Sequence, residues 1–188
     1  MSTEYIVETT HVAGRALRVV FDWHVDRFTH TVGVVDGDRF EPLLVSVEGM
    51  ADDHWPRSPA FQNLSMMEST ALLVGMAGTS HYSASVEAVS SAIRFDMACR
   101  VKQQPEYLGS EYQTLPPVKT VDTGSISFIS CGRSGRLQLR SNHPASVTTT
   151  ATATGITLRT NTFAESYPET IRWDYQLDLE VRPLIARL

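Results

Sequence analysis

Three long runs of the chain have an apolar residue at every second position. They span residues 17–26, 93–101 and 171–182. Each contains an aromatic residue followed by aspartate: Phe21-Asp22, Phe95-Asp96 and Trp173-Asp174. Successive side chains of a strand point to opposite faces, so this period predicts three strands with one buried and one solvated face. The residues that we expect in the core from these runs are Phe21, Trp23, Phe95, Trp173 and Tyr175.

The polar faces of these runs carry arginine and aspartate. Arg94 and Arg172 precede the aromatic residue in the second and third runs, whereas the first run has Val20 there and His24 two residues beyond Asp22. Arginine and aspartate on adjacent antiparallel strands can pair across a sheet. The segments between the three copies do not resemble one another, which favours independent strands over an internal duplication.

Most of the remaining chain has the pattern of short strands joined by turns. The expected strands are 5–11, 28–35, 39–47, 71–76, 82–89, 124–130, 136–141, 147–154 and 156–160. Asp36-Gly37-Asp38 predicts a tight hairpin, and the threonine-rich segment 147–154 predicts an edge or surface strand. The sequence therefore predicts an all-β fold, a single-domain antiparallel β-barrel or two-layer β-sandwich of about a dozen strands with little or no helix.

Residues 58–70 are compatible with two structures. Ser58-Pro59 could begin a helix, whereas a strand over 61–67 would pair with the strand at 71–76, and we favour the strand. Segments 49–59 and 105–117 contain glycine and several prolines and predict irregular structure. We expect residues 1–188 to form one domain, with 104–118 as the candidate boundary if the chain has two halves.

Composition narrows the class of protein. The 188 residues are 42% hydrophobic with a net charge of -5, which is typical of a soluble globular protein and argues against general nucleic-acid binding. No apolar run approaches the roughly 20 residues of a spanning helix, and the N-terminus lacks the features of a signal peptide. We expect a cytoplasmic protein with no membrane partner. Its two cysteines, Cys99 in the second run and Cys131 in a turn, predict reduced thiols.

The polar face of the first run offers one possible metal site. Asp22, His24 and Asp26 share that face, but neighbours along it lie about 7 Å apart, so only two of them could share an ion. Imidazole and carboxylate suit zinc or another divalent transition metal. A further ligand would have to come from another strand, and the candidates are His30, His81 and Glu87. The alternative is a solvated strand face, and the lack of a diagnostic ligand spacing favours it. No other cofactor is predicted.

Two turn-rich segments offer candidate ligand contacts. Asp53, His54 and Trp55 combine an acid, an imidazole and an aromatic ring in a loop, and loops on rigid sheets often carry function. His81 follows a glycine- and hydroxyl-rich segment that lacks the motif of a nucleophile elbow or of a phosphate loop. We therefore predict ligand binding at Asp53, His54, Trp55 and His81. The structural alternatives are a surface loop anchored by Trp55 and a tight hairpin before His81.

These observations favour one class of function and leave two others open. No nucleophile, general base or metal signature is recognisable, so a non-catalytic module that binds a small molecule or a protein is favoured over an enzyme. One alternative is a metal-dependent enzyme with Asp22 and His24 as ligands. The other is a structural subunit of a homo-oligomer that associates through unpaired edge strands.

Overall fold

The computed structural model describes residues 5–115, 119–122, 126–130, 135–141, 143, 146–161 and 165–180. These residues form fifteen strands, all paired antiparallel, and contain no helix. The all-β prediction is confirmed, with more strands than the dozen expected. Within the same residues there is accordingly no helix of the length and apolarity needed to cross a membrane.

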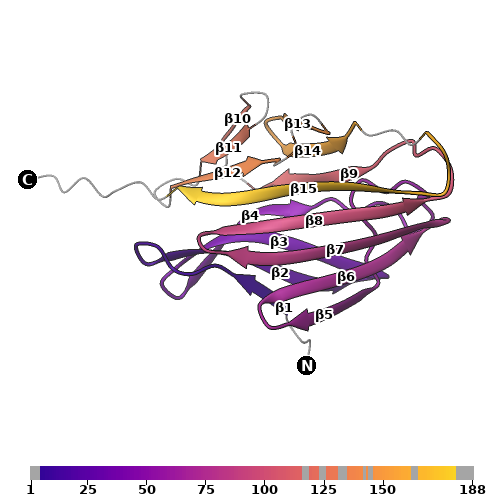
Figure 1. The fold of residues 1–188 in the computed structure, drawn as a ribbon. Helices are drawn as coiled ribbons and strands as arrows, with labels where there is room; N and C mark the ends of the chain where they lie inside the picture. The colour runs from indigo at the N-terminus through magenta and orange to yellow at the C-terminus, as the bar shows by residue number, and fades with distance from the viewer. Residues whose placement is uncertain are drawn as a thin grey trace, which may run out of the picture.

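The strands form two sheets that face each other as layers (Figure 1). The seven-stranded sheet has the order β1-β2-β3-β4-β9-β14-β13, and the eight-stranded sheet has the order β10-β11-β12-β15-β8-β7-β6-β5. Each sheet ends in edge strands and does not close on itself. The fold is therefore a two-layer β-sandwich, and of the two predicted architectures the barrel was wrong.

The strands of the two sheets have the following bounds. The seven-stranded sheet contains β1 (Tyr5–Glu8), β2 (Arg15–His24), β3 (Arg27–Asp36), β4 (Arg39–Ser46), β9 (Gly109–Thr114), β14 (Gly155–Thr160) and β13 (Val147–Ala151). The eight-stranded sheet contains β10 (Lys119–Asp122), β11 (Ile126–Ser130), β12 (Arg136–Arg140), β15 (Glu169–Glu180), β8 (Ala92–Val101), β7 (Ser80–Val89), β6 (Thr70–Ala77) and β5 (Asn63–Met67).

Several local predictions are confirmed. Gly37 adopts the positive φ of +60° that the β3–β4 hairpin requires. Residues 63–67 form a strand that pairs with β6, which decides the ambiguity at 58–70 in favour of strand. The threonine-rich β13 is an edge strand of the first sheet. Cys99 is a buried free thiol, whereas Cys131 lies outside the described residues.

Two local predictions were wrong. The segment 105–117, expected to be irregular, contains β9, which pairs with both β4 and β14 inside the first sheet. Trp23 was expected in the core but is 52% exposed, because β2 runs on toward the turn at Val25, which is itself exposed. The Trp23 ring packs edge-on against Phe28, with 5.1 Å between the ring centroids. The other four predicted core aromatic residues are buried.

Strands β8 and β15 form the centre of the second sheet, and their register positions the candidate site. Asp96 lies opposite Asp174, Arg94 lies opposite Gln176, and Ala98 lies opposite Arg172. The alternate residues Phe95, Trp173 and Tyr175 point inward and are buried. The second and third copies of the aromatic-aspartate pattern therefore lie side by side, with their charged residues on the outer face.

Candidate functional site

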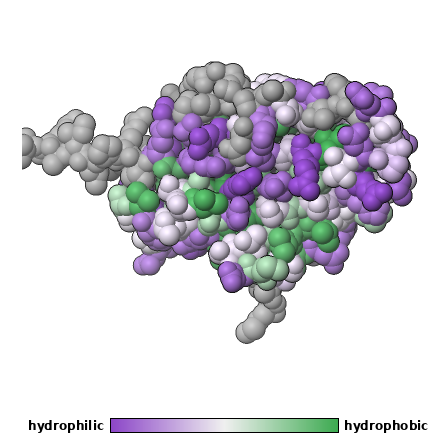
Figure 2. Space-filling model, viewed as in Figure 1, coloured by the Kyte–Doolittle hydropathy of each residue, from purple (hydrophilic) through white to green (hydrophobic). Residues whose placement is uncertain are grey.

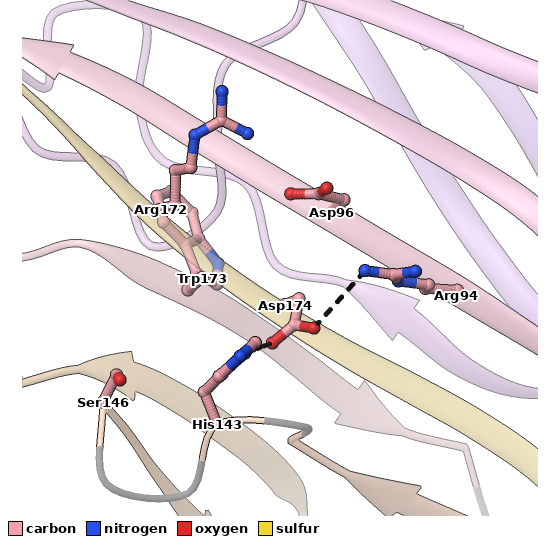
Figure 3. A pocket seen from close by; sticks show the side chains of 7 residues that line it. All are labelled: Arg94, Asp96, His143, Ser146, Arg172, Trp173 and Asp174. Atoms are coloured by element: carbon pink, nitrogen blue, oxygen red, sulfur yellow. Dashed lines mark hydrogen bonds and ion pairs between the residues drawn. The ribbon is translucent and has the colours of Figure 1, made fainter.

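A charged pocket of about 310 Å³ lies on the outer face of the second sheet, over β8 and β15 (Figure 3). Its lining consists of Arg94, Asp96, His143, Ser146, Arg172, Trp173 and Asp174. The strands β8 and β15 supply all of these residues except two, which come from the segment before β13. We name this hollow the charged pocket.

The charged pocket contains two aspartates that face each other across the strand pair. Like charges at directly opposite positions of an antiparallel pair repel, so they need neutralising partners. Asp174 is only 5% exposed, and its Oδ1 lies 2.9 Å from Nδ1 of His143. Its Oδ2 lies 3.9 Å from a guanidinium nitrogen of Arg94. Asp174 is thereby held in place by groups on both sides, as the dashed lines in Figure 3 show.

Other polar groups of the charged pocket retain free hydrogen-bonding capacity. The Nε of Arg94 is buried and has no hydrogen-bond partner among the described residues. The side chains of Arg172 and Asp96 make no hydrogen bond or ion pair with another described residue. In Figure 3 Asp96 lies between the two arginines. The charged pocket therefore offers two guanidinium donors and one carboxylate acceptor to a ligand.

The charged pocket also contains serine, histidine and aspartate, the residue types of a nucleophilic triad. A triad needs the serine hydroxyl within hydrogen-bond reach of the imidazole. Here the Ser146 backbone N–H donates to the His143 carbonyl at 2.9 Å, and the described residues show no bond between the hydroxyl and the ring. In Figure 3 Ser146 lies apart from the imidazole ring of His143. Among the described residues, this arrangement does not provide an activated serine nucleophile.

The loop predicted to contact a ligand forms a separate hollow of about 340 Å³. It is lined by Asp52, Asp53, His54, Trp55, Gln103 and Glu106. Asp53 accepts a hydrogen bond from the backbone N–H of Met50 at 2.7 Å, and Trp55 packs against the core. The His54 ring lies so close to Gly78 that a Cβ there would approach it to 2.5 Å. The structure thus brings Asp53, His54 and Trp55 together, each with a structural contact.

The fourth predicted ligand-binding residue, His81, is not part of that loop hollow. It lies on β7, exposed on the outer face of the second sheet, where its cross-strand partners are Met76 and Arg100. Ligand binding by these four residues stays a prediction.

The predicted metal ligands do not form a cluster. Asp22 and His24 are exposed at the end of β2, while Asp26 lies in the turn and pairs with Arg27 through Oδ1 and Nε at 2.9 Å. His30 is buried between the sheets. The two other candidate ligands lie on β7 in the opposite sheet, and the described part of the chain contains no group of three His, Cys, Asp or Glu residues suited to a metal ion.

A chain of buried polar groups joins the two sheets, and the sequence analysis missed it. The Nε2 of His30 on β3 lies 2.8 Å from the hydroxyl of Tyr112 on β9, which lies 2.6 Å from the hydroxyl of Tyr175 on β15. The His30 backbone N–H donates to Ser46 at 2.9 Å, and the Ser46 hydroxyl donates to Glu48 at 2.5 Å. Of these residues only Tyr175 was a predicted core residue.

Burial shifts the pKa values of several groups in this network. It lowers the pKa of His30 to about 4, which keeps the imidazole neutral near pH 7. It raises the pKa of Glu48 to about 7, against the opposing effects of the Ser46 hydrogen bond and the Arg27 charge. It also raises the pKa of Tyr112 well above its ordinary value. Perturbed groups often mark functional sites, but these line none of the hollows described above, and their hydrogen bonds join β3 and β9 of one sheet to β15 of the other.

The charged pocket is therefore the best-supported site. The signal in the sequence was the repeated Arg-aromatic-Asp pattern, but only the register of β8 against β15 shows that two copies meet. A comparison of the chain with protein-family models, with curated proteins and with solved structures finds no match.

Proposed function

We propose that the protein is a non-catalytic module that binds a small polar ligand in the charged pocket. The observation that carries this proposal is the unused hydrogen-bonding capacity of Arg94, Arg172 and Asp96 around a hollow of about 310 Å³. That volume lies at the lower end of the range for small-molecule sites, which typically contain a few convergent polar groups.

The chemistry of the charged pocket indicates the type of ligand. Guanidinium groups bind carboxylate or phosphate through parallel N–H donors, and the buried Nε of Arg94 gains most from such an acceptor because it is otherwise unsatisfied. Asp96 accepts from a hydroxyl or ammonium group. A ligand with one anionic group and neighbouring hydroxyls, such as a sugar acid, would engage both kinds of group.

The experiment compares D-glucuronate with D-glucose as probes, because the two differ in the anionic group. We expect glucuronate to raise the melting temperature in a concentration-dependent manner, since a ligand that binds only the folded state stabilises it, and we expect glucose to have little effect. Arg172→Gln should abolish the shift. Arg39→Gln is the matched control, because it removes one exposed arginine from the other sheet.

Two results would overturn this proposal. One is an equal shift by glucose and glucuronate, and the other is an unchanged shift in the Arg172→Gln variant. A separate measurement tests whether the protein is non-catalytic. NMR spectra of glucuronate should be the same before and after long incubation with the protein.

A further inference from the structure

The register of the second sheet places side chains of four strands in rows on its outer face. Residues that are cross-strand partners point to the same side of a sheet. One row, across β6, β7, β8 and β15, is Met76, His81, Arg100 and Thr170, and the next row is Val74, Ser83, Ala98 and Arg172. The second row ends at Arg172, which lines the charged pocket, and the other residues of the two rows lie beside that pocket.

The centre of these rows is hollow because its side chains are small. Ser83 and Ala98 lie side by side there, while the longer side chains of Met76 and Arg100 lie in the neighbouring row. The resulting hollow has a volume of about 560 Å³, and a second hollow of about 520 Å³ continues past Lys102. Both are walled by His81 and Arg100, so we treat them as one groove, the basic groove.

The basic groove is positive at one end. Arg100, Lys102 and His81 line it, and none of its described lining residues is an aspartate or glutamate. The side chains of Arg100 and Lys102 make no hydrogen bond or ion pair with another described residue. This concentration of uncompensated positive charge occurs in a chain whose net charge is -5. A bound anion would supply the missing charge.

The other end of the basic groove is apolar. Val74 is 51% exposed and Met76 is 48% exposed, and in Figure 2 hydrophobic side chains gather over β6. The backbone of Met76 is fixed by the Gln62 side chain, whose Nε2 donates to the Met76 carbonyl at 3.1 Å and whose Oε1 accepts from its N–H at 2.6 Å. The backbone that carries Met76 is therefore held in position before any ligand arrives, and a fixed backbone lowers the entropic cost of binding.

We propose that the basic groove binds an organic anion with an apolar body, with its charged group at Arg100 and Lys102 and its chain or ring over Val74 and Met76. Charge complementarity selects the anion, and burial of Val74 and Met76 selects the apolar body. The basic groove and the charged pocket have no lining residue in common. The proposed anion site is therefore separate from the charged pocket, and its proposal does not depend on the function proposed above.

The test uses octane-1-sulfonate as the probe, with octylammonium and inorganic sulfate as comparisons, each titrated by calorimetry below micelle formation. We expect octane-1-sulfonate to bind at least tenfold more tightly than either comparison, because only it has both the charge and the chain. Arg100→Gln should weaken its binding at least tenfold, whereas Arg39→Gln, which removes an exposed arginine remote from the groove, should leave the dissociation constant unchanged.

A second measurement locates the bound probe. In protein with ¹³C-labelled methionine methyl groups, assigned with Met76→Leu, the Met76 resonance should move during the titration. The resonance of Met50, which is also exposed but lies in the loop after β4, should stay in place. Equal affinity for octylammonium, an unchanged affinity in the Arg100→Gln variant, or a stationary Met76 resonance would each overturn the proposal.

Discussion

Replacing Glu48 with glutamine tests the account of the buried polar network. One carboxylate oxygen of Glu48 accepts a hydrogen bond from Ser46, and the other is buried without a partner among the described residues. Glutamine has nearly the same shape and keeps an acceptor for Ser46, but it cannot ionise. The substitution Glu48→Gln therefore removes the titration and leaves most of the packing in place.

The magnitude follows from the difference between the folded and unfolded states. Burial raises the pKa of Glu48 from its ordinary value of 4.5 to about 7 in the folded protein. At about 1.4 kcal/mol for each pKa unit, this corresponds to about 3 kcal/mol. Because the folded state prefers the protonated acid, this contribution is fully present below pH 4.5 and is lost as the pH rises through 7.

His30 has the opposite effect in the wild-type protein. Burial lowers its pKa to about 4, so the stability associated with the neutral imidazole is present above pH 6.5 and is lost as the pH falls through 4. Between pH 4.5 and 6.5 the folded state retains a proton on Glu48 while the unfolded state retains one on His30. The two contributions to the pH dependence therefore nearly cancel over this interval.

The assay is urea unfolding of the wild type and of Glu48→Gln at a series of pH values from 4.5 to 8.5. We expect the variant to gain about 3 kcal/mol relative to the wild type between pH 4.5 and pH 8, because only the wild type has to bury a carboxylate at high pH. Glu68→Gln, in the exposed β5–β6 turn, is the control for the amide substitution. A stability difference that is the same at pH 4.5 and pH 8 would refute the reasoning.

Three further substitutions test individual contacts by urea unfolding. Tyr112→Phe removes the hydroxyl that joins the two sheets and should lower the free energy of unfolding by about 1–3 kcal/mol, because its buried partners lose a hydrogen bond. An unchanged free energy of unfolding would show that these hydrogen bonds contribute little. Gly33→Ala should destabilise the protein by about 1–3 kcal/mol, since a Cβ there would lie 2.6 Å from the Phe40 ring; a stabilised variant would contradict that packing. Asp96→Asn should stabilise it by about 0.2–1 kcal/mol at low salt by removing repulsion with Asp174, and an effect that does not shrink in high salt would disprove this cause.

The sequence predicted the existence of the long strands better than their burial toward the ends, and it left barrel and sandwich open. Alternation identified β2, β8 and β15 because each has a buried face whose residues recur at every second position. The same alternation continued past the covered part of β2, so it wrongly placed Trp23 in the core. Periodicity reports the face of a strand and does not report how far the opposite sheet extends.

Strand β9 shows a different limit of sequence reasoning. Its flanking prolines and Gly109 predicted irregular structure, yet the glycine has a structural role in the sheet. A Cβ at Gly109 would approach the Leu158 carbonyl on β14 to 2.1 Å, so close contact between these backbones requires glycine. Because this strand was missed, Tyr112 was missed as well, and with it the hydrogen-bonded chain between the sheets.

The charged pocket could not be predicted from any single strand. The aromatic-aspartate pattern is compatible with an ordinary solvated strand face, and its first copy, which has Val20 in place of arginine, contained the candidate metal ligands Asp22 and His24. The charged pocket depends on the register that places Asp96 opposite Asp174. Opposed carboxylates repel each other, and His143 and Arg94 both lie beside Asp174 as neutralising partners. The side chains of Arg172 and Asp96 have no such partner among the described residues. Long-range strand pairing, and not the local pattern, therefore decides which copies of the pattern line the charged pocket.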